Sequence, residues 1–152
     1  MTDANIFGPV DAVLAAELGV GDVILIEAVI LVLVVANFVT RKVAHDRHRE
    51  QAAEGPGAIT RFLPHEVLNV VVVLATFYYM TVAHHGGMVL SVLVLGLFIA
   101  DFFEFEARKV DARRDVPLDQ PKGSIAAGML VLAYAGYQAL FFLIEGPVGA
   151  II

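Results

Sequence analysis

Four long apolar segments constrain the fold of this 152-residue chain more than any other feature. They run from about 23 to 40, 64 to 83, 88 to 107 and 124 to 144. A membrane-spanning helix needs about 20 mostly apolar residues, and each segment is close to that length. Hydrophobic residues make up 59% of the chain, an excess that a bilayer explains. We therefore predict an all-α fold: one membrane domain over residues 1–152, built as a four-transmembrane-helix up-down bundle.

All ten basic residues fall in two stretches of the sequence. Five lie between the first and second apolar segments, and five lie between the third and fourth. The positive-inside rule places such stretches in the cytoplasm. We therefore predict cytoplasmic loops over residues 41–63 and 108–123, extracellular termini and a location in the plasma membrane. The second and third segments are separated only by a short turn over His84–Gly87, which predicts an antiparallel hairpin.

A shorter amphipathic stretch precedes the first apolar segment. Its apolar residues share one face at helical spacing: Val10, Val13, Leu14 and Leu18. Asp11 and Glu17 lie off that face. This pattern predicts a short N-terminal interfacial helix that lies on the outer surface of the membrane.

Polar residues inside the apolar segments are the first candidates for a functional site. A charged group in hydrocarbon costs roughly 2.5–3.5 kcal/mol on insertion scales, so each such residue needs a reason to be there. Because neighbouring helices run in opposite directions, five of them are predicted to share the inner third of the bilayer: Asn37, Glu66, Asn69, Asp101 and Glu104. One hypothesis is a polar site or half-channel for a cation or proton, built from the three carboxylates.

The alternative hypothesis is that these carboxylates form ion pairs with basic residues at the membrane interface, namely Arg41, Lys42, Arg61 and Arg108. Glu104 and Arg108 are four residues apart, in the order that favours a helical ion pair. Asp101 is the hardest to explain in this way, because it lies about two helical turns inside the end of its segment. We expect no metal at this site.

A looser group of polar residues is predicted near the outer ends of the helices. Glu27 lies about one turn inside the first segment. We expect a buried hydrogen bond between Glu27 and a Tyr or Gln side chain. The alternative is a shallow outer site for a quinone head group, a metal or a haem. The first, third and fourth segments contain no histidine, which excludes a haem held by histidines on facing helices of one chain.

The fourth segment carries a face of small residues, formed by Gly128, Ala135, Gly136 and Ala139. Small residues let membrane helices approach one another closely. The helix that packs on this face could belong to the same bundle or to a neighbouring protein, and the sequence leaves both open.

The amino-acid composition of the chain resembles that of a known group of proteins. Lysine is scarce, cysteine is absent, and Asp, Ala, Val and Gly are plentiful. In this respect the whole chain resembles the small uncharacterised multi-pass membrane proteins of haloarchaea, which implies a halophilic archaeal source and no particular activity. Without cysteine, disulfides and thiol chemistry are excluded. His65 and Glu66 begin an HExxH pattern, but Asn69 occupies the place of the second histidine, so a zinc-protease motif is excluded as well.

Three functions are compatible with these observations. The leading prediction is a non-catalytic accessory or structural subunit of a larger membrane assembly or homo-oligomer, because the chain is short and carries no catalytic motif. The second is a small ion or proton transporter that uses Asp101, Glu104 and Glu27. The third is a lipid-, quinone- or carotenoid-binding protein with aromatic grooves; a lipid or carotenoid would then be bound, and otherwise we expect no cofactor. Membrane lipids are expected partners, but nucleic acid is not, because the basic loops lack interleaved aromatic residues.

Overall fold

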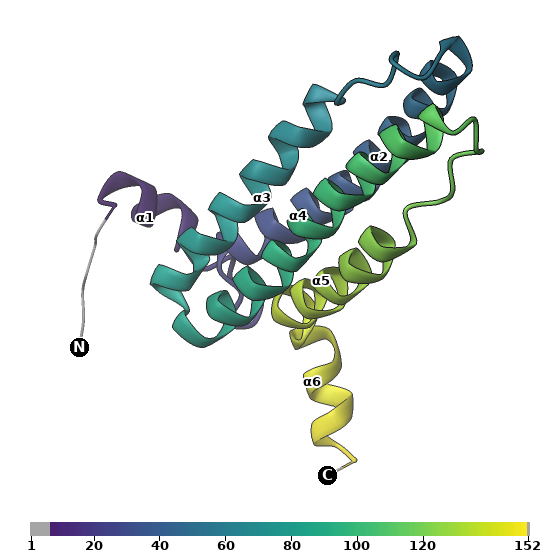
Figure 1. The fold of residues 1–152 in the computed structure, drawn as a ribbon. Coiled ribbons are helices and arrows are strands. Elements are labelled where there is room, and N and C mark those ends of the chain that lie inside the picture. Colours follow the sequence, from purple (N-terminus) through teal and green to yellow (C-terminus); the bar gives the residue numbers. More distant parts are fainter. Residues whose placement is uncertain (1–6, 152) are drawn as a thin grey trace.

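The computed structural model describes residues 7–151, and this part of the chain forms six helices and no strand. Four helices build a bundle: α2 (Leu25–Glu54), α3 (Leu63–Val82), α4 (His84–Arg113) and α5 (Lys122–Leu140). Each packs against the next, and α5 also packs against α2, which closes the ring (Figure 1). The all-α prediction is therefore confirmed. Residues 1–6 and 152 of the predicted domain lie outside the described part.

Three helices are long and apolar enough to cross a membrane, namely α3, α4 and α5. They contain the third predicted segment and most of the second and fourth. The first predicted segment, residues 23–40, corresponds to the first half of α2, whose second half is charged. Large apolar side chains also face outward on every helix of the bundle: Val32, Leu74, Val92 and Leu130 are each at least 60% exposed. Apolar exteriors of this extent mark surfaces that contact a membrane or another protein.

Both long helices continue beyond the apolar segments that the sequence delimits. α2 runs past Thr40 as far as Glu54, where Gly55 ends it with a φ of 144°. α4 runs as far as Arg113. The stretches predicted as loops, 41–63 and 108–123, are therefore helical in their first parts and irregular only over 55–62 and 114–121. Helical ion pairs such as Lys42–Asp46 stabilise these extensions.

A single residue, Ala83, connects α3 to α4. The sequence predicts a turn over His84–Gly87, but in the structure these residues form the first turn of α4. A Cβ atom on Gly87 would overlap the backbone of Met80 in α3. The hairpin is therefore tighter than predicted, because Gly87 has no side chain to separate the two helices.

The fourth predicted segment, residues 124–144, is divided between two helices. α5 ends at Leu140, and α6 (Phe142–Gly149) continues in a different direction, away from the bundle (Figure 1). Gly146 and Pro147, residues that disfavour helix, both lie inside α6. The proline costs the short helix the hydrogen bond of one backbone N–H, and the helix continues to Gly149.

Helix α1 (Pro9–Leu14) lies at the same end of the bundle as α6 (Figure 1). One contact from α1 and one from the preceding Phe7 attach this part of the chain to α3. Asp11 accepts a hydrogen bond of 2.8 Å from the hydroxyl of Tyr78. The ring of Phe7 lies 5.7 Å from that of Tyr78.

Candidate functional site

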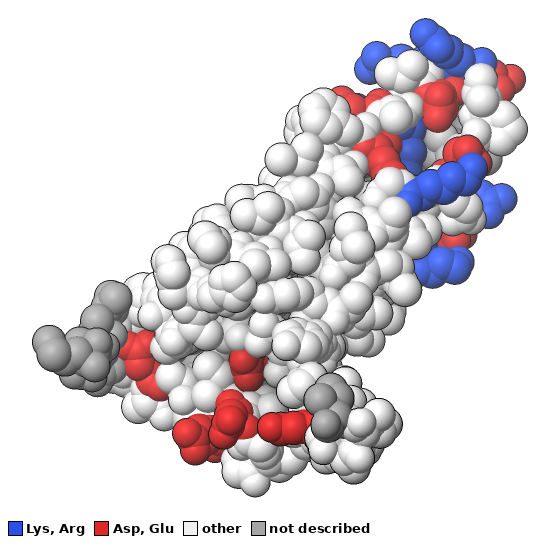
Figure 2. All heavy atoms as spheres, turned by 90° about the horizontal axis from the view of Figure 1, so that it is seen from below, with Lys and Arg blue, Asp and Glu red and all other residues white. Residues whose placement is uncertain are grey.

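The two ends of the bundle differ in charge. Lysine and arginine gather at the end formed by the last turns of α2 and α4, which we call the basic end (Figure 2). The opposite end, where α1 and α6 lie, has Asp and Glu as its only charged residues in the described part, and we call it the acidic end (Figure 2).

A buried ion pair lies inside the basic end. The guanidinium of Arg41 on α2 contacts both carboxylate oxygens of Asp101 on α4, with Nε–Oδ1 at 3.1 Å and Nη2–Oδ2 at 2.8 Å. The two side chains are 4% and 13% exposed. Such bidentate pairs are among the strongest polar contacts in proteins, and burial makes each charge dependent on the other.

His65 of α3 extends this ion pair to a third helix. Its Nε2 lies 3.3 Å from Oδ2 of Asp101, and its Nδ1 lies 2.8 Å from the hydroxyl of Thr40. A carboxylate, an imidazole and a hydroxyl in this order resemble a nucleophilic triad. However, Thr40 lies within α2, whose backbone N–H groups are used by the helix, and Arg41 holds the charge of Asp101. The hydroxyl of Thr40 also donates to the carbonyl oxygen of Asn37, and the whole arrangement joins α2, α3 and α4.

The other polar residues predicted for this region have different partners. The side-chain amide of Asn37 donates a hydrogen bond of 2.6 Å to Oδ1 of Asn69. Glu66 pairs with Arg61 at 3.3 Å, in the segment that precedes α3. Glu104 accepts hydrogen bonds from the backbone N–H and the hydroxyl of Ser124 near the start of α5. The predicted ion pair between Glu104 and Arg108 is not formed.

Arg108 donates a hydrogen bond to a histidine instead. Its Nη1 lies 3.0 Å from Nδ1 of His48, whose Nε2 lies 3.0 Å from the carbonyl oxygen of Thr60. Since a guanidinium only donates, Nδ1 must accept and Nε2–H must donate, so the ring is neutral. Burial and the neighbouring Arg108 lower the pKa of His48 to about 4. The pKa of the buried His45 is also lowered, mainly by burial.

A second polar cluster lies at the acidic end. Glu27 accepts a hydrogen bond of 3.1 Å from the backbone N–H of Ile24 and one of 2.5 Å from the hydroxyl of Tyr79. That hydroxyl also lies 3.3 Å from Oε1 of Gln138. The hydrogen bond from a tyrosine to Glu27 is thus present as predicted, and it joins α2 to α3.

An apolar layer separates the two clusters. It consists of buried side chains from all four helices of the bundle, each at most 2% exposed: Ile30, Val34, Val72, Leu90, Val94 and Val131. Along α2, Glu27 and Asn37 are about 15 Å apart. The hydroxyl of Thr76 donates to its own helix, and that of Ser91 has no hydrogen-bond partner among the described residues. Neither hydroxyl links the clusters.

The small residues of α5 pack mainly within the bundle. Ala135 and Ala139 are buried, and a Cβ atom on Gly128 would lie 2.9 Å from the ring of Phe38 on α2. Gly136 differs, because the space around it is open. Three of the four predicted packing residues therefore serve the contact with α2 and its neighbours.

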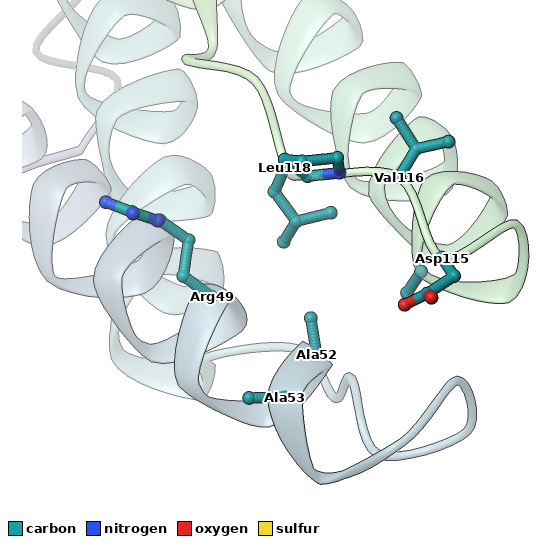
Figure 3. A pocket seen from close by; sticks show the side chains of 8 residues that line it. Arg49, Ala52, Ala53, Asp115, Val116 and Leu118 are labelled. Carbon is teal, nitrogen blue, oxygen red and sulfur yellow. The ribbon is translucent and has the colours of Figure 1, made fainter.

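Among the hollows on the surface near the basic end are two that lie between different helices or segments. One is a cleft of 310 Å³ between the last turns of α2 and the segment after α4; Arg49 and Ala52 lie on one side, with Asp115 and Leu118 on the other (Figure 3). The second, which we call the lateral groove, has a volume of 360 Å³ and lies between α3 and α4. Its lining residues are Arg61, Leu63, Glu66, Asn69, Phe98, Asp101 and Phe102.

Three residues of the buried network lie outside the candidate site of the sequence analysis: His48, His65 and Arg41, of which Arg41 was expected only as an ion-pair partner of the carboxylates. The sequence contains a signal for two of them. Arg41 follows Asn37 by four residues, and His65 precedes Asn69 by four, so each shares a helical face with a polar residue inside the bundle. His48 is signalled only by its position seven residues after Arg41 on the same face.

The fold and the polar clusters define a class of protein: a helical bundle with helices able to cross a membrane, whose buried charged groups are paired within the chain. More particularly, the chain belongs to the family described as Domain of unknown function (DUF7313), whose family model matches residues 2–152. No curated protein and no solved structure matches the chain.

Proposed function

We propose that this chain is an integral membrane protein that crosses the plasma membrane four times, with α2 as the additional span. The first half of α2 exposes apolar side chains, including Val32, Val35 and Val39. The positive-inside rule then places the basic end in the cytoplasm and both termini outside. In this orientation α1 lies on the outer surface, with Val10 and Val13 exposed toward the lipid.

Within that membrane placement, we propose that the chain is a non-catalytic accessory or structural subunit. The observation that carries this proposal is the internal pairing of the carboxylates. Asp101 is held by Arg41 and His65, and Glu104 and Glu27 are held by hydrogen bonds from neighbouring helices. A transported ion or proton would need these groups to be free and connected, whereas an apolar layer separates the two clusters. Paired charges of this kind are suited to fixing how helices pack.

Two glycines on the outside of the bundle support association with another membrane protein or a second copy. The space around Gly96 on α4 and Gly136 on α5 is open. A helix can approach such positions closely, and membrane helices associate through such contacts. The rest of this exterior is formed by large apolar side chains that lipid would cover.

The test is purification from native membranes in a mild detergent, followed by mass spectrometry and a mass measurement of the intact complex. A partner in fixed ratio, or a defined homo-oligomer, is the expected result. Gly96→Leu and Gly136→Leu should reduce the association, whereas Val92→Leu, at an exposed position already occupied by a large side chain, should leave it intact. A monomer without partners in all preparations would contradict the subunit proposal. Proton or ion flux through the purified protein in vesicles, lost in an Asp101→Asn variant that still folds, would replace it with transport.

A further inference from the structure

The lateral groove between α3 and α4 combines an apolar wall with a polar floor. Leu63, Phe98 and Phe102 provide the apolar wall, and Asn69 and Asp101 lie deeper. Its volume of 360 Å³ is within the range of small-molecule sites, roughly 300–1,000 Å³. Asn69 lies six residues into α3, about 9 Å along the helix axis. In the proposed membrane placement, the groove therefore opens sideways into the inner leaflet.

The charges that line the groove are already balanced. Arg61 contacts both Glu66 and Glu106, at 3.3 and 3.2 Å. Asp101 is neutralised by Arg41 and also contacts His65. A phosphate would have to compete with carboxylates for Arg61, and an ammonium group would have to compete with a guanidinium for Asp101. The groove is therefore suited to a molecule whose polar end is neutral.

The floor of the groove offers a hydrogen-bond donor that the protein does not use. Asn69 is 5% exposed, and its Oδ1 accepts the hydrogen bond from Asn37. Within residues 7–151, the amide nitrogen of Asn69 has no hydrogen-bond partner. An amide N–H pairs well with a carbonyl oxygen. The polar end of the ligand should therefore present an acceptor.

Aromatic rings lie beside this donor. Phe98 and Phe102 are four residues apart on α4, so they share one face of the helix. Phe102 is 45% exposed, although Arg61 also lies over its ring at 5.2 Å. Exposed aromatic rings favour contact with a flat ring of the ligand.

We propose that the lateral groove binds the head group of a membrane quinone. One quinone carbonyl accepts a hydrogen bond from the amide nitrogen of Asn69, and the quinone ring packs against Phe98 and Phe102. The apolar tail leaves the groove along the surface of α3 and α4 into the bilayer. This inference rests on the proposed membrane placement, but not on the proposed role as a subunit.

The absence of tryptophan makes a fluorescence test possible, because one introduced tryptophan is the only one in the chain. Phe98→Trp places it in the groove, and Phe141→Trp places a control near the acidic end. Each full-length variant is reconstituted in phospholipid vesicles and titrated with a benzoquinone that carries a ten-carbon tail. We expect quenching at position 98 to saturate near one quinone per protein, and quenching at position 141 to rise without saturation.

Two neighbouring phenylalanines provide a matched control in the Phe98→Trp background. Phe102 lines the groove, whereas Phe103 is 64% exposed and is not among the lining residues. Phe102→Ala should raise the quinone concentration that half-saturates the quenching about tenfold or more. Phe103→Ala should change that concentration by no more than about twofold. Asn69→Leu should raise that concentration as well, and the phenylalanine variants keep the test decisive if Asn69→Leu does not fold. Equal effects of Phe102→Ala and Phe103→Ala would overturn the proposal.

Phospholipids with brominated tails distinguish the remaining outcomes. If they quench the tryptophan at position 98 and quinone does not displace them, the groove holds a lipid tail and the quinone proposal is wrong. If they quench neither tryptophan, the membrane placement itself is wrong, and the proposed function fails along with this inference. Quenching by these lipids at both positions, together with saturable quinone quenching at position 98 alone, supports both.

Discussion

Arg41 and Asp101 show how one pair of residues organises the basic end. Each side chain alone would place an uncompensated charge inside the bundle, and together they neutralise one another. The pair also orients His65, which connects to the hydroxyl of Thr40. A contact among three helices therefore depends on two charges that are adjacent only in the folded state.

Replacing one member of this pair should destabilise the bundle strongly. In Asp101→Asn, Arg41 remains charged and buried without its partner, which should cost about 3–5 kcal/mol of unfolding free energy. The double variant Arg41→Gln with Asp101→Asn should be more stable than the sum of the single changes predicts. The measurement is unfolding of the detergent-solubilised protein monitored by circular dichroism. Glu66→Gln, which removes one partner of the half-exposed Arg61, should cost about 1 kcal/mol or less. Equal losses for Asp101→Asn and Glu66→Gln would contradict this interpretation.

The buried His48 predicts how stability depends on pH. Its pKa is about 4 in the folded protein and 6.5 in an exposed histidine, so the unfolded state binds more protons between these values. The contribution of neutral His48 to the free energy of unfolding should be fully present above pH 6.5. It should decrease as the pH falls toward 4, by at most about 3 kcal/mol. Unfolding midpoints measured at several pH values test this. The slope should be smaller in His48→Asn, with a remainder from His45; an unchanged slope would show that other groups cause it.

Tyr79 connects helices at the acidic end, as Arg41 and Asp101 do at the basic end. Tyr79→Phe removes the hydrogen bond to Glu27 and leaves a carboxylate oxygen without this donor, which should cost about 1–3 kcal/mol. Tyr137→Phe is the control, because Tyr137 is 53% exposed and should tolerate the change. Thermal unfolding of the two variants in the same detergent compares them. If Tyr137→Phe were the more destabilising, the proposed contact would not be important for stability.

The helices of this protein end at places that follow from local chemistry. α2 and α4 extend beyond the apolar segments because their charged continuations still favour helix and form ion pairs such as Lys42–Asp46. The hairpin of α3 and α4 is closed by one residue because glycine at position 87 allows the two backbones to touch. The length of a helix and the closeness of two neighbouring helices thus have separate causes.

Two glycines of α4 should respond in opposite ways to the same substitution. Gly87→Ala introduces a methyl group that overlaps the backbone of Met80, so we expect a loss of about 2 kcal/mol or more. Gly96→Ala places the methyl group in open space, where alanine favours helix by about 1 kcal/mol over glycine. Thermal unfolding of both variants in detergent provides the comparison. A neutral Gly87→Ala would mean that α3 and α4 are farther apart than the structure shows.

Charge is distributed unevenly between the two ends of the molecule. Basic residues gather at one end, and in the described part the only charged residues at the other end are acidic (Figure 2). This separation is the basis of the proposed orientation, and it can be tested because the chain has no cysteine. Single variants Glu17→Cys, Glu54→Cys and Glu145→Cys report on the two ends of α2 and on the end of the chain near α6. Positions 17 and 145 should react with a membrane-impermeant maleimide on intact cells, and position 54 only after permeabilisation. Labelling of 17 and 54 on the same side would contradict a span through α2.

Much of the architecture follows from the sequence, because long apolar segments restrict a chain to helices in a bilayer. The depth of Asp101, Asn37 and Asn69 could be estimated from helical rise alone. The partners of the polar residues could not be predicted in the same way. For example, the spacing of Glu104 and Arg108 favours an ion pair that the bundle does not form. Glu104 accepts a hydrogen bond from Ser124, and Arg108 donates one to His48. Both partners lie on other helices, which no local sequence pattern identifies.

The sequence alone determined the helical class, the positions of the apolar segments and the separation of charge, since these depend on composition and on order along the chain. The tertiary structure decided which polar groups meet. It placed Arg41 against Asp101, sixty residues away, closed the acidic end around Glu27 and left the amide of Asn69 open to the lateral groove. The physical reason is that helix rotation and pairing are set by the packing of all four helices together, which no single segment encodes.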